Sequence, residues 1–154
     1  AEETIAEVME KVTQAYLDVL TEYLPALLDG SAPRTPQDET RATYTCKRLP
    51  EDNLIDWKAP TDVIYNLIRG TTNPYPGAFT TLSGRKLIIW AAQRIAYRPY
   101  VGRIPGRVID VHPGVGVVVL TGDGALLLTQ VQWEDEPPVT ADSILNSLSC
   151  TLNT

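Results

Sequence analysis

The hydrophobic and polar positions of residues 4–29 follow the period of an α-helix. Thr4 and Glu7 have the spacing of a capping box, and Gly30 is a typical helix stop. Pro25 falls inside the pattern and is expected to kink the last turn or restart it. Since a lone amphipathic helix is marginal in water, this apolar stripe needs a partner surface. Its positions recur every three or four residues, at Ile5, Val8, Met9, Val12, Tyr16, Val19, Leu20, Tyr23, Leu24 and Leu27.

From Gly30 to residue 58 the sequence has no sustained period and is rich in polar and turn residues, which predicts a connector. Ile55 and Trp57 are expected to form an apolar anchor at its end. A short helix is predicted from Pro60 to Arg69, because proline is tolerated in the first turn and the following glycine can end it. Its expected buried residues are Val63, Ile64, Leu67 and Ile68.

The stretch from Asn73 to Phe79 separates the helical pattern from a second kind of pattern. Pro74 and Pro76 fix φ and lack a backbone donor, and Gly77 allows conformations that other residues resist. The chain is therefore not expected to be helical here. Phe79 is expected to plug the core of the structure that follows.

After Gly77, short apolar runs alternate with turn residues, which predicts strands over 78–82, 86–92, 107–111, 115–120 and 125–133. In the second run Leu87, Ile89 and Ala91 are expected to share a face. In the last run the expected inward residues are Leu127, Thr129, Val131 and Trp133. About five evenly spaced strands predict a small barrel, and Thr140–Leu148 is expected to be a short terminal helix.

Composition agrees with an ordinary globular protein, with 44% hydrophobic and 21% charged residues. No apolar run approaches the roughly 20 residues that a membrane span needs, so no membrane partner is expected. The sequence opens with Ala1-Glu2-Glu3 and lacks a secretory signal pattern. It is therefore expected to be part of a longer, cytoplasmic protein.

Charge is unevenly distributed along the chain. Residues 1–54 carry eleven acids and five bases, which gives −6, whereas residues 55–154 carry eight of each and are neutral. No acid occurs from Val63 to Ile109. The net acidity therefore belongs to the first third and conceals a basic stretch, which contains Arg69, Arg85, Lys86, Arg94, Arg98, Arg103 and Arg107.

Part of this basic stretch is the main candidate for ligand binding. Trp90, Tyr97 and Tyr100 lie among its charges, and basic residues interleaved with aromatic ones can hold a nucleic acid strand or a phosphorylated ligand. The alternative is a mixed surface that packs against the acidic N-terminal part. We favour the alternative, since an RNA-binding barrel is usually strongly basic as a whole. The candidate contacts are Arg85, Lys86, Arg94, Arg98, Arg103 and Arg107.

Other chemistry is less well supported. Cys46 and Cys150 are expected to be buried free thiols in a reducing cytosol, and with a single histidine, His112, no tetrahedral zinc set can form. His112 is expected in a turn. Gly122-Asp123-Gly124 joins two predicted strands, so a hairpin turn is expected rather than a phosphate cradle. The acidic pairs and the run Glu134-Asp135-Glu136 are interpreted as solvated surface.

A set of motifs runs through the middle of the chain: Gln37, Ala42-Thr43-Tyr44, Arg48, Glu51-Asp52, Ile55-Asp56-Trp57, Asn66-Leu67-Ile68-Arg69 and Pro74-Tyr75-Pro76-Gly77-Ala78-Phe79. In combination they resemble the 10-formyltetrahydrofolate-dependent formyltransferases. This family includes methionyl-tRNA formyltransferase and the UDP-aminoarabinose formyltransferase domain of polymyxin-resistance enzymes. Pro105-Gly106-Arg107-Val108 and Gly122-Asp123-Gly124-Ala125-Leu126 are similar to the family's closing barrel.

The resemblance implies an α+β fold: a small OB-like open β-barrel, like the formyltransferase C-terminal domain, preceded by a long amphipathic helix and a linker. Residues 1–30 would be the terminal helix of a Rossmann-like catalytic domain upstream, 31–58 an interdomain linker, and 59–154 the C-terminal barrel. The family's catalytic Asn-x-His motif and Asp have no counterpart here. The chain is therefore expected to be inactive alone and to bind no cofactor or metal. 10-formyltetrahydrofolate is implied for the full-length parent.

Two functions remain open for the parent. In the first, it formylates a small amine such as an amino sugar nucleotide, and this chain shapes the structure beside an upstream catalytic domain. In the second, the chain is the tRNA-binding accessory barrel of a methionyl-tRNA formyltransferase. The neutrality of residues 55–154 favours the first, so nucleic acid is the less favoured partner.

Overall fold

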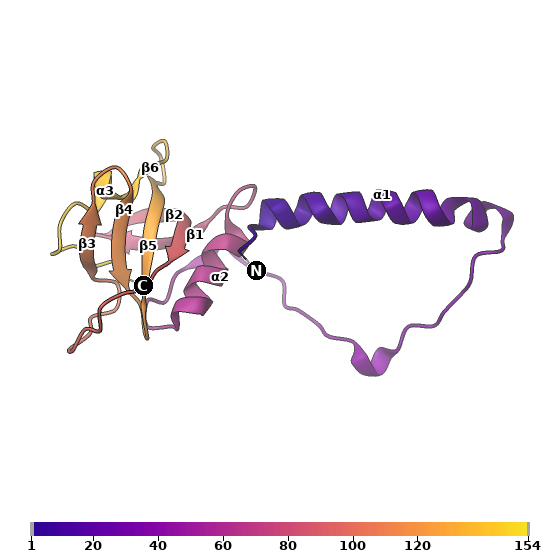
Figure 1. The fold of residues 1–154 in the computed structure, drawn as a ribbon, viewed down its shortest axis with the longest axis horizontal. Coiled ribbons are helices and arrows are strands. Elements are labelled where there is room, and N and C mark those ends of the chain that lie inside the picture. Colours follow the sequence, from indigo (N-terminus) through magenta and orange to yellow (C-terminus); the bar gives the residue numbers. More distant parts are fainter. Residues whose placement is uncertain (1, 154) are drawn as a thin grey trace.

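The computed structural model of the chain describes residues 2–153 and contains an open antiparallel sheet, short flanking helices and one long helix (Figure 1). The long helix α1 spans Ile5–Asp29, and α2 spans Thr61–Thr71. The strands are β1 (Ala78–Leu82), β2 (Arg85–Arg94), β3 (Val108–His112), β4 (Gly116–Leu120), β5 (Ala125–Trp133) and β6 (Val139–Thr140). A four-residue helix α3 (Ala141–Ile144) follows, and short 3-10 turns occur at Glu39–Arg41 and Pro50–Asn53.

The sheet has the order β1-β2-β5-β4-β3, with β6 paired to β5, and every neighbouring pair is antiparallel. Ser83 and Gly84 join β1 to β2, and both have positive φ (52° and 78°), as the tight turns of hairpins require. The expected α+β class is confirmed, and the open sheet has six strands where about five were expected. Sequence neighbours pair in β1–β2, β3–β4 and β4–β5, whereas β2 pairs with the distant β5.

The core lies between the sheet and α2, and it includes residues from the connector. Ile55 and Trp57 are 0% and 2% exposed, so the expected apolar anchor is confirmed. The Ile55 amide donates to the carbonyl of Phe79 at 2.8 Å, and the Trp57 indole donates to the Thr80 hydroxyl at 2.9 Å. The packed unit therefore begins before residue 59.

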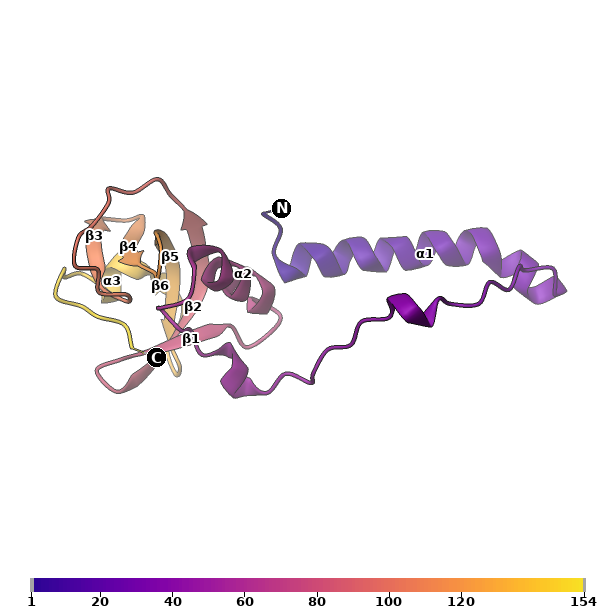
Figure 2. The ribbon, with the colours of Figure 1, turned by 90° about the horizontal axis from the view of Figure 1, so that it is seen from below.

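Helix α1 extends away from the sheet, and the connector returns from its far end (Figures 1 and 2). The expected capping box of Thr4 and Glu7 is present, and Gly30 ends the helix with φ of 80°. The helix continues through Pro25 to Asp29 instead of restarting there. None of its residues is buried, and after the half-buried Ile5 the apolar stripe is exposed from Val8 to Leu27.

Of the residues predicted to be buried in the second helix, Ile64 and Ile68 are buried and Leu67 is half-buried, whereas the prediction for Val63 was wrong. Helix α2 passes Gly70 and ends at Thr71, and it turns Ile64, Tyr65 and Ile68 inward. Val63 lies on the opposite face and is 56% exposed, because residues one position apart on a helix point about 100° apart. The terminal helix is also shorter than expected. After Ile144 the chain leaves the helix, and its last residues form backbone bridges to Thr81 and Arg107.

The prediction of which residues of β5 point inward was wrong in the first half of the strand. Leu126 and Leu128 are buried there instead of Leu127 and Thr129, whereas Val131 is buried as expected. The change of phase lies opposite an irregularity in β2, where the pairing shifts between Ile89 and Ala92. A bulge redirects side chains between the faces of a sheet, and simple alternation does not predict it.

The predictions that Phe79 plugs the core and that Cys46 is buried were also wrong. Phe79 is half-buried and carries the Lys86 ammonium 4.9 Å from its ring centre, while its neighbour Ala78 fills the core position. Cys46 is exposed and Cys150 is half-buried; both are free. Among residues 2–153, no helix is both long and apolar enough to cross a bilayer.

Candidate functional site

The six basic candidates do not converge on one site. Arg85 and Lys86 begin β2, and Arg94 ends this ten-residue strand. Because a strand rises about 3.3 Å per residue, roughly 30 Å separates the two ends. Arg98, Arg103 and Arg107 follow on the segment between β2 and β3. The candidates therefore divide between the two ends of β2.

Arg85 and Lys86 are paired with acids from the loop after β5. Arg85 lies 2.9 Å from a carboxylate oxygen of Glu136, and Lys86 lies 2.7 Å from one of Glu134. The Arg85 guanidinium also stacks on the Trp133 ring, 4.2 Å from its centre. The acidic run that looked like solvated surface thus supplies partners for these two bases.

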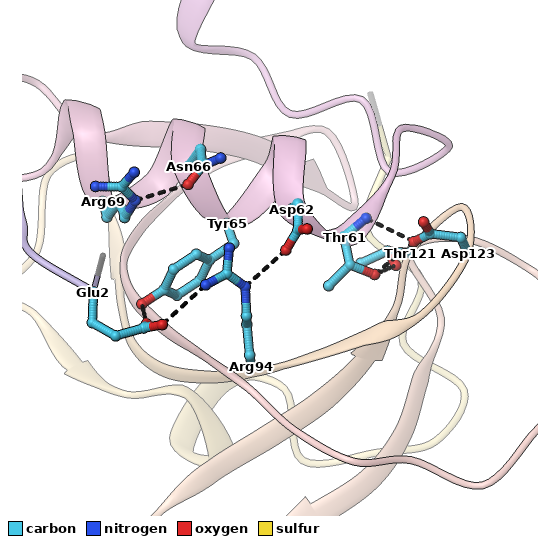
Figure 3. Close-up of polar contacts among 9 residues, drawn as sticks. All are labelled: Glu2, Thr61, Asp62, Tyr65, Asn66, Arg69, Arg94, Thr121 and Asp123. Atoms are coloured by element: carbon cyan, nitrogen blue, oxygen red, sulfur yellow. Dashed lines mark hydrogen bonds and ion pairs between the residues drawn. The ribbon is translucent and has the colours of Figure 1, made fainter.

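Arg94 is the centre of a polar network at the other end of β2 (Figure 3). Its Nε donates to Asp62 on α2 at 2.8 Å, and its Nη1 donates to Glu2 at 3.0 Å. The guanidinium lies over the Tyr65 ring, and the Tyr65 hydroxyl donates to the same Glu2 at 2.5 Å. We call these four residues, Arg94, Asp62, Tyr65 and Glu2, the Arg94 network.

The network joins the segment before α1 to the sheet and α2. The hydrogen bond from Tyr65 lowers the pKa of Glu2, and the same bond raises the pKa of Tyr65. Arg69 adds a second link, since its Nη1 donates to the carbonyl of Glu3 at 2.8 Å. Basic residues of the window therefore contact the acidic N-terminal part at this point.

Arg103 is bound to backbone rather than open to a ligand. Its guanidinium donates to the carbonyl of Thr121 at 2.8 Å, to that of Gly124 at 2.6 Å and to the Tyr97 hydroxyl at 2.9 Å. The Tyr97 hydroxyl in turn donates to the carbonyl of Asp123 at 2.6 Å. This arrangement fixes the turn between β4 and β5.

The same turn is joined to the start of α2 (Figure 3). The Asp123 carboxylate accepts from the Thr61 amide and from the Thr61 hydroxyl, both at 2.7 Å, and these bonds lower the pKa of Asp123. Thr121 and Thr61 share a further hydroxyl contact of 2.7 Å. The glycine-flanked Asp123 is therefore part of a hairpin turn, as expected.

Arg98 differs from the other candidates. Arg107 donates to the Thr151 hydroxyl at 2.6 Å, whereas Arg98 is exposed and forms no hydrogen bond or ion pair within residues 2–153. It borders a groove of about 380 Å³ between residues 95–100 and the outer face of β3 and β4. The groove is lined by Ile95, Ala96, Tyr97, Arg98, Tyr100, Ile109, Asp110, His112 and Val118. We call it the Arg98 groove.

A second cavity, of about 460 Å³, lies where α1, the connector and the end of α2 meet. Its lining is mainly apolar and includes Ile5, Leu49, Pro50, Tyr75 and Pro76. The guanidinium of Arg48 at its edge donates to the carbonyl of Asp52 and to the side chain of Asn53.

His112 ends β3 and is about half exposed, with its Nε2 3.5 Å from Asp110. Across residues 2–153, no cluster of three or more His, Cys, Asp or Glu side chains is arranged to hold a metal ion. The residue two positions before His112 is an aspartate, so the local sequence Asp110-Val111-His112 is not an Asn-x-His motif.

Sequence reasoning favoured packing of the basic stretch against the acidic N-terminal part, as Arg94 and Glu2 show, but it did not predict which residues pair. Arg94 meets residues 92 and 32 positions away in Glu2 and Asp62, and no local spacing signals such contacts. The floor of the Arg98 groove was also missed, because Ile109 and Val118 read as ordinary strand residues. The interleaving of Tyr97 and Tyr100 with arginines was the one local signal of the groove.

Comparison with known proteins identifies what the chain is similar to. Residues 48–149 match the family model described as "Formyl transferase, C-terminal domain". A methionyl-tRNA formyltransferase of Moorella thermoacetica is 42% identical over 131 residues, covering 85% of this chain and 41% of that protein. One of Bacillus licheniformis is 40% identical over 131 residues, covering 84% of this chain and 40% of that protein. The chain thus spans about two fifths of the length of these relatives.

Solved structures show the same fold. A variant of HypX from Aquifex aeolicus superposes with a TM-score of 0.70 at 20% identity, over 95% of this chain and 25% of that one. HypX in complex with tetrahydrofolic acid gives a TM-score of 0.69 at the same identity, over 94% of this chain and 25% of that one. At this level of identity the likeness concerns the fold.

Proposed function

Because the chain belongs to the formyltransferase family, whose C-terminal domain matches residues 48–149, we propose that it is the C-terminal part of a methionyl-tRNA formyltransferase. The observation that carries the proposal is the identity of 42% and 40% to two proteins with that name. The small-amine substrate that the neutral charge of residues 55–154 favoured gives way to the alternative, transfer RNA.

The parent reaction is transfer of a formyl group from 10-formyltetrahydrofolate to the amine of methionine esterified to tRNA. The amine attacks the formyl carbon, the bond between that carbon and the folate nitrogen breaks, and the proton that the amine loses balances the one that the leaving nitrogen takes up. We assign this chemistry to an upstream catalytic domain and give this chain no step in it. The solvated pair His112 and Asp110 does not supply the Asn and His that the family uses.

Within this proposal, residues 1–30 are the last helix of the catalytic domain, 31–58 are the linker and 59–154 are the barrel. The exposed apolar stripe of α1 supports the first assignment, since a helix face of this kind needs a covering surface. The core positions of Ile55 and Trp57 support a linker whose end is built into the barrel. The Arg94 network then lies at the junction of the two domains.

The decisive experiment is formylation by the full-length protein, with methionyl-tRNA and a UDP-amino sugar as competing acceptors. We expect transfer to methionyl-tRNA alone, and no transfer or donor hydrolysis by the 154-residue chain. Formylation of the amino sugar but not of the tRNA would refute the substrate assignment. Turnover by the purified chain itself would show that the chemistry is not upstream.

A further inference from the structure

The Arg98 groove has the composition of a site for one unpaired nucleotide. Its floor is the apolar outer face of β3 and β4, where Ile95, Tyr97 and Ile109 pack on a small buried cluster that includes Val118. Its rim carries Tyr100, which is 41% exposed, and the exposed guanidinium of Arg98. An aromatic ring over an apolar floor accepts the face of any base, and an arginine beside it can meet a phosphate.

The groove is held in shape before any ligand arrives. Tyr97, in its wall, is fixed by its hydrogen bond to the carbonyl of Asp123 and by the Arg103 guanidinium. The turn that holds Tyr97 is itself joined to α2 through Thr61. A preformed groove loses little conformational entropy on binding, which favours recognition of a small rigid group such as a base.

Charge in the groove orients such a ligand. The Asp110 carboxylate lies in the lining with His112 3.5 Å from it, so like-charge repulsion disfavours a phosphate beside Asp110. Arg98 forms no ion pair within residues 2–153, whereas Arg85, Lys86 and Arg94 are each matched with carboxylates. Arg103 and Arg107 form no ion pair among the described residues either, but their guanidiniums donate to backbone carbonyls and to the Thr151 hydroxyl. Arg98 is therefore the candidate whose guanidinium has no partner within residues 2–153 and is free for an outside anion.

We propose that the Arg98 groove binds one unpaired nucleotide of an RNA, with the base stacked on Tyr100 and its phosphate bound by Arg98. This inference rests on the proposed function, because it assumes that the partner of the barrel is RNA. It adds the position of a single-stranded contact on the outer face of β3 and β4. It also explains why a neutral barrel need not present a broad basic surface.

Binding of a fluorescein-labelled, unstructured oligoribonucleotide to the 154-residue chain tests the site, over a series of salt concentrations. Tyr100→Ala is expected to weaken binding roughly tenfold with the salt slope unchanged, because stacking is lost but no charge. Arg98→Ala is expected to reduce the slope of log affinity against log salt by about 0.7, the value of one phosphate contact on a single strand.

Two matched controls separate the groove from general electrostatics. Arg85→Ala removes the same charge at the other end of β2, and Tyr44→Ala removes a tyrosine that is 88% exposed in the connector. Both are expected to bind as the unaltered chain does. Equal weakening by either control would overturn the proposal, as would undetectable binding of the oligoribonucleotide at low salt.

Two further measurements separate loss of RNA binding in the groove from unfolding of a variant and from failure of the proposed function. Unfolding midpoints of all variants are measured first, and Tyr100→Leu, which keeps apolar bulk but lacks the ring, replaces Tyr100→Ala if that variant unfolds. Unchanged binding by folded Tyr100 and Arg98 variants would overturn the groove assignment. If the full-length protein still formylated methionyl-tRNA, the proposed function would stand without it.

Discussion

The guanidinium of Arg94 lies 4.3 Å from the centre of the Tyr65 ring, and both side chains bind the same carboxylate, that of Glu2. Arg94 ends β2, Tyr65 lies on the inward side of α2, and Glu2 precedes α1. Three segments that are far apart in sequence therefore meet through one polar network. In the proposed enzyme this network sets where the helix of the catalytic domain leaves the barrel.

Replacing Arg94 with alanine is expected to loosen this junction without unfolding the sheet. The variant loses ion pairs to Asp62 and Glu2 together with the stacking on Tyr65. Since exposed ion pairs are individually weak, we expect amide hydrogen exchange in the first half of α1 to rise only a few-fold.

Arg85→Ala is the matched control for that prediction. It also loses an ion pair and an aromatic contact, but at the opposite end of β2. Its exchange in α1 is expected to equal that of the unaltered chain. If Arg94→Ala leaves exchange in α1 unchanged, the network does not hold the junction.

Asp123 is expected to make the stability of the barrel dependent on pH in the acidic range. The bonds from Thr61 lower its pKa in the folded state below the unfolded value of about 3.9. The stabilisation is therefore complete above about pH 4 and is lost as pH falls through the folded pKa. Asp123→Asn is expected to lower the free energy of unfolding by about 0.5–1 kcal/mol at neutral pH. On acidification, the free energy of unfolding of this variant should fall less than that of the unaltered chain.

Urea denaturation at neutral pH and at low pH measures this difference. Asp135→Asn serves as control, because Asp135 is exposed and forms no hydrogen bond or ion pair among the described residues. It should follow the pH profile of the unaltered chain. Identical profiles for Asp123→Asn and the unaltered chain would show that Asp123 does not couple folding to pH.

Gly106 is expected to be much less tolerant of substitution than Gly102, although both have positive φ (85° and 68°). A Cβ at Gly106 would lie 2.2 Å from the carbonyl oxygen of Leu152, whereas nothing lies within 4 Å of one at Gly102. Gly102→Ala is expected to lower the free energy of unfolding by about 1 kcal/mol, because of its backbone conformation alone. Gly106→Ala should cost at least about 3 kcal/mol, since it also displaces the C-terminal segment.

Chemical denaturation of the two variants checks the prediction. The comparison is informative because the backbone conformation is shared and only the surroundings differ. Similar unfolding free energies would mean that the segment around Leu152 adjusts freely, and that its hydrogen bond to the Gly106 carbonyl contributes little.

The sequence predicted the elements better than the contacts between them. The limits of α1 followed from Thr4 and Gly30, and β5 ran over the residues expected, because caps, turns and apolar runs are local signals. The inward face of β5 was wrong near Leu127, since the bulge that changes it lies on another strand.

Pairing of charges was beyond local reasoning. Arg85, Arg94 and Arg98 look alike in sequence, yet two are matched with acids and one is not. Which arginine is free depends on where the loop after β5 and the segment before α1 lie in space. A neutral total charge therefore did not indicate how the basic residues are used.

The exposed stripe of α1 is expected to make the 154-residue chain self-associate. Val12 and Leu20 are about half exposed and lie on this stripe, and no residue of α1 is buried. Because exposed apolar faces of this size associate in water, sedimentation velocity should show oligomers that grow with concentration. The double variant Val12→Glu, Leu20→Glu should sediment as a monomer, since glutamate keeps the helix but removes its apolar face.

The control Val101→Glu, Leu148→Glu adds the same charge at exposed positions outside α1 and should associate like the unaltered chain. A chain that is monomeric at every concentration would show that the stripe needs no partner, and it would remove the support for α1 as a helix of the catalytic domain.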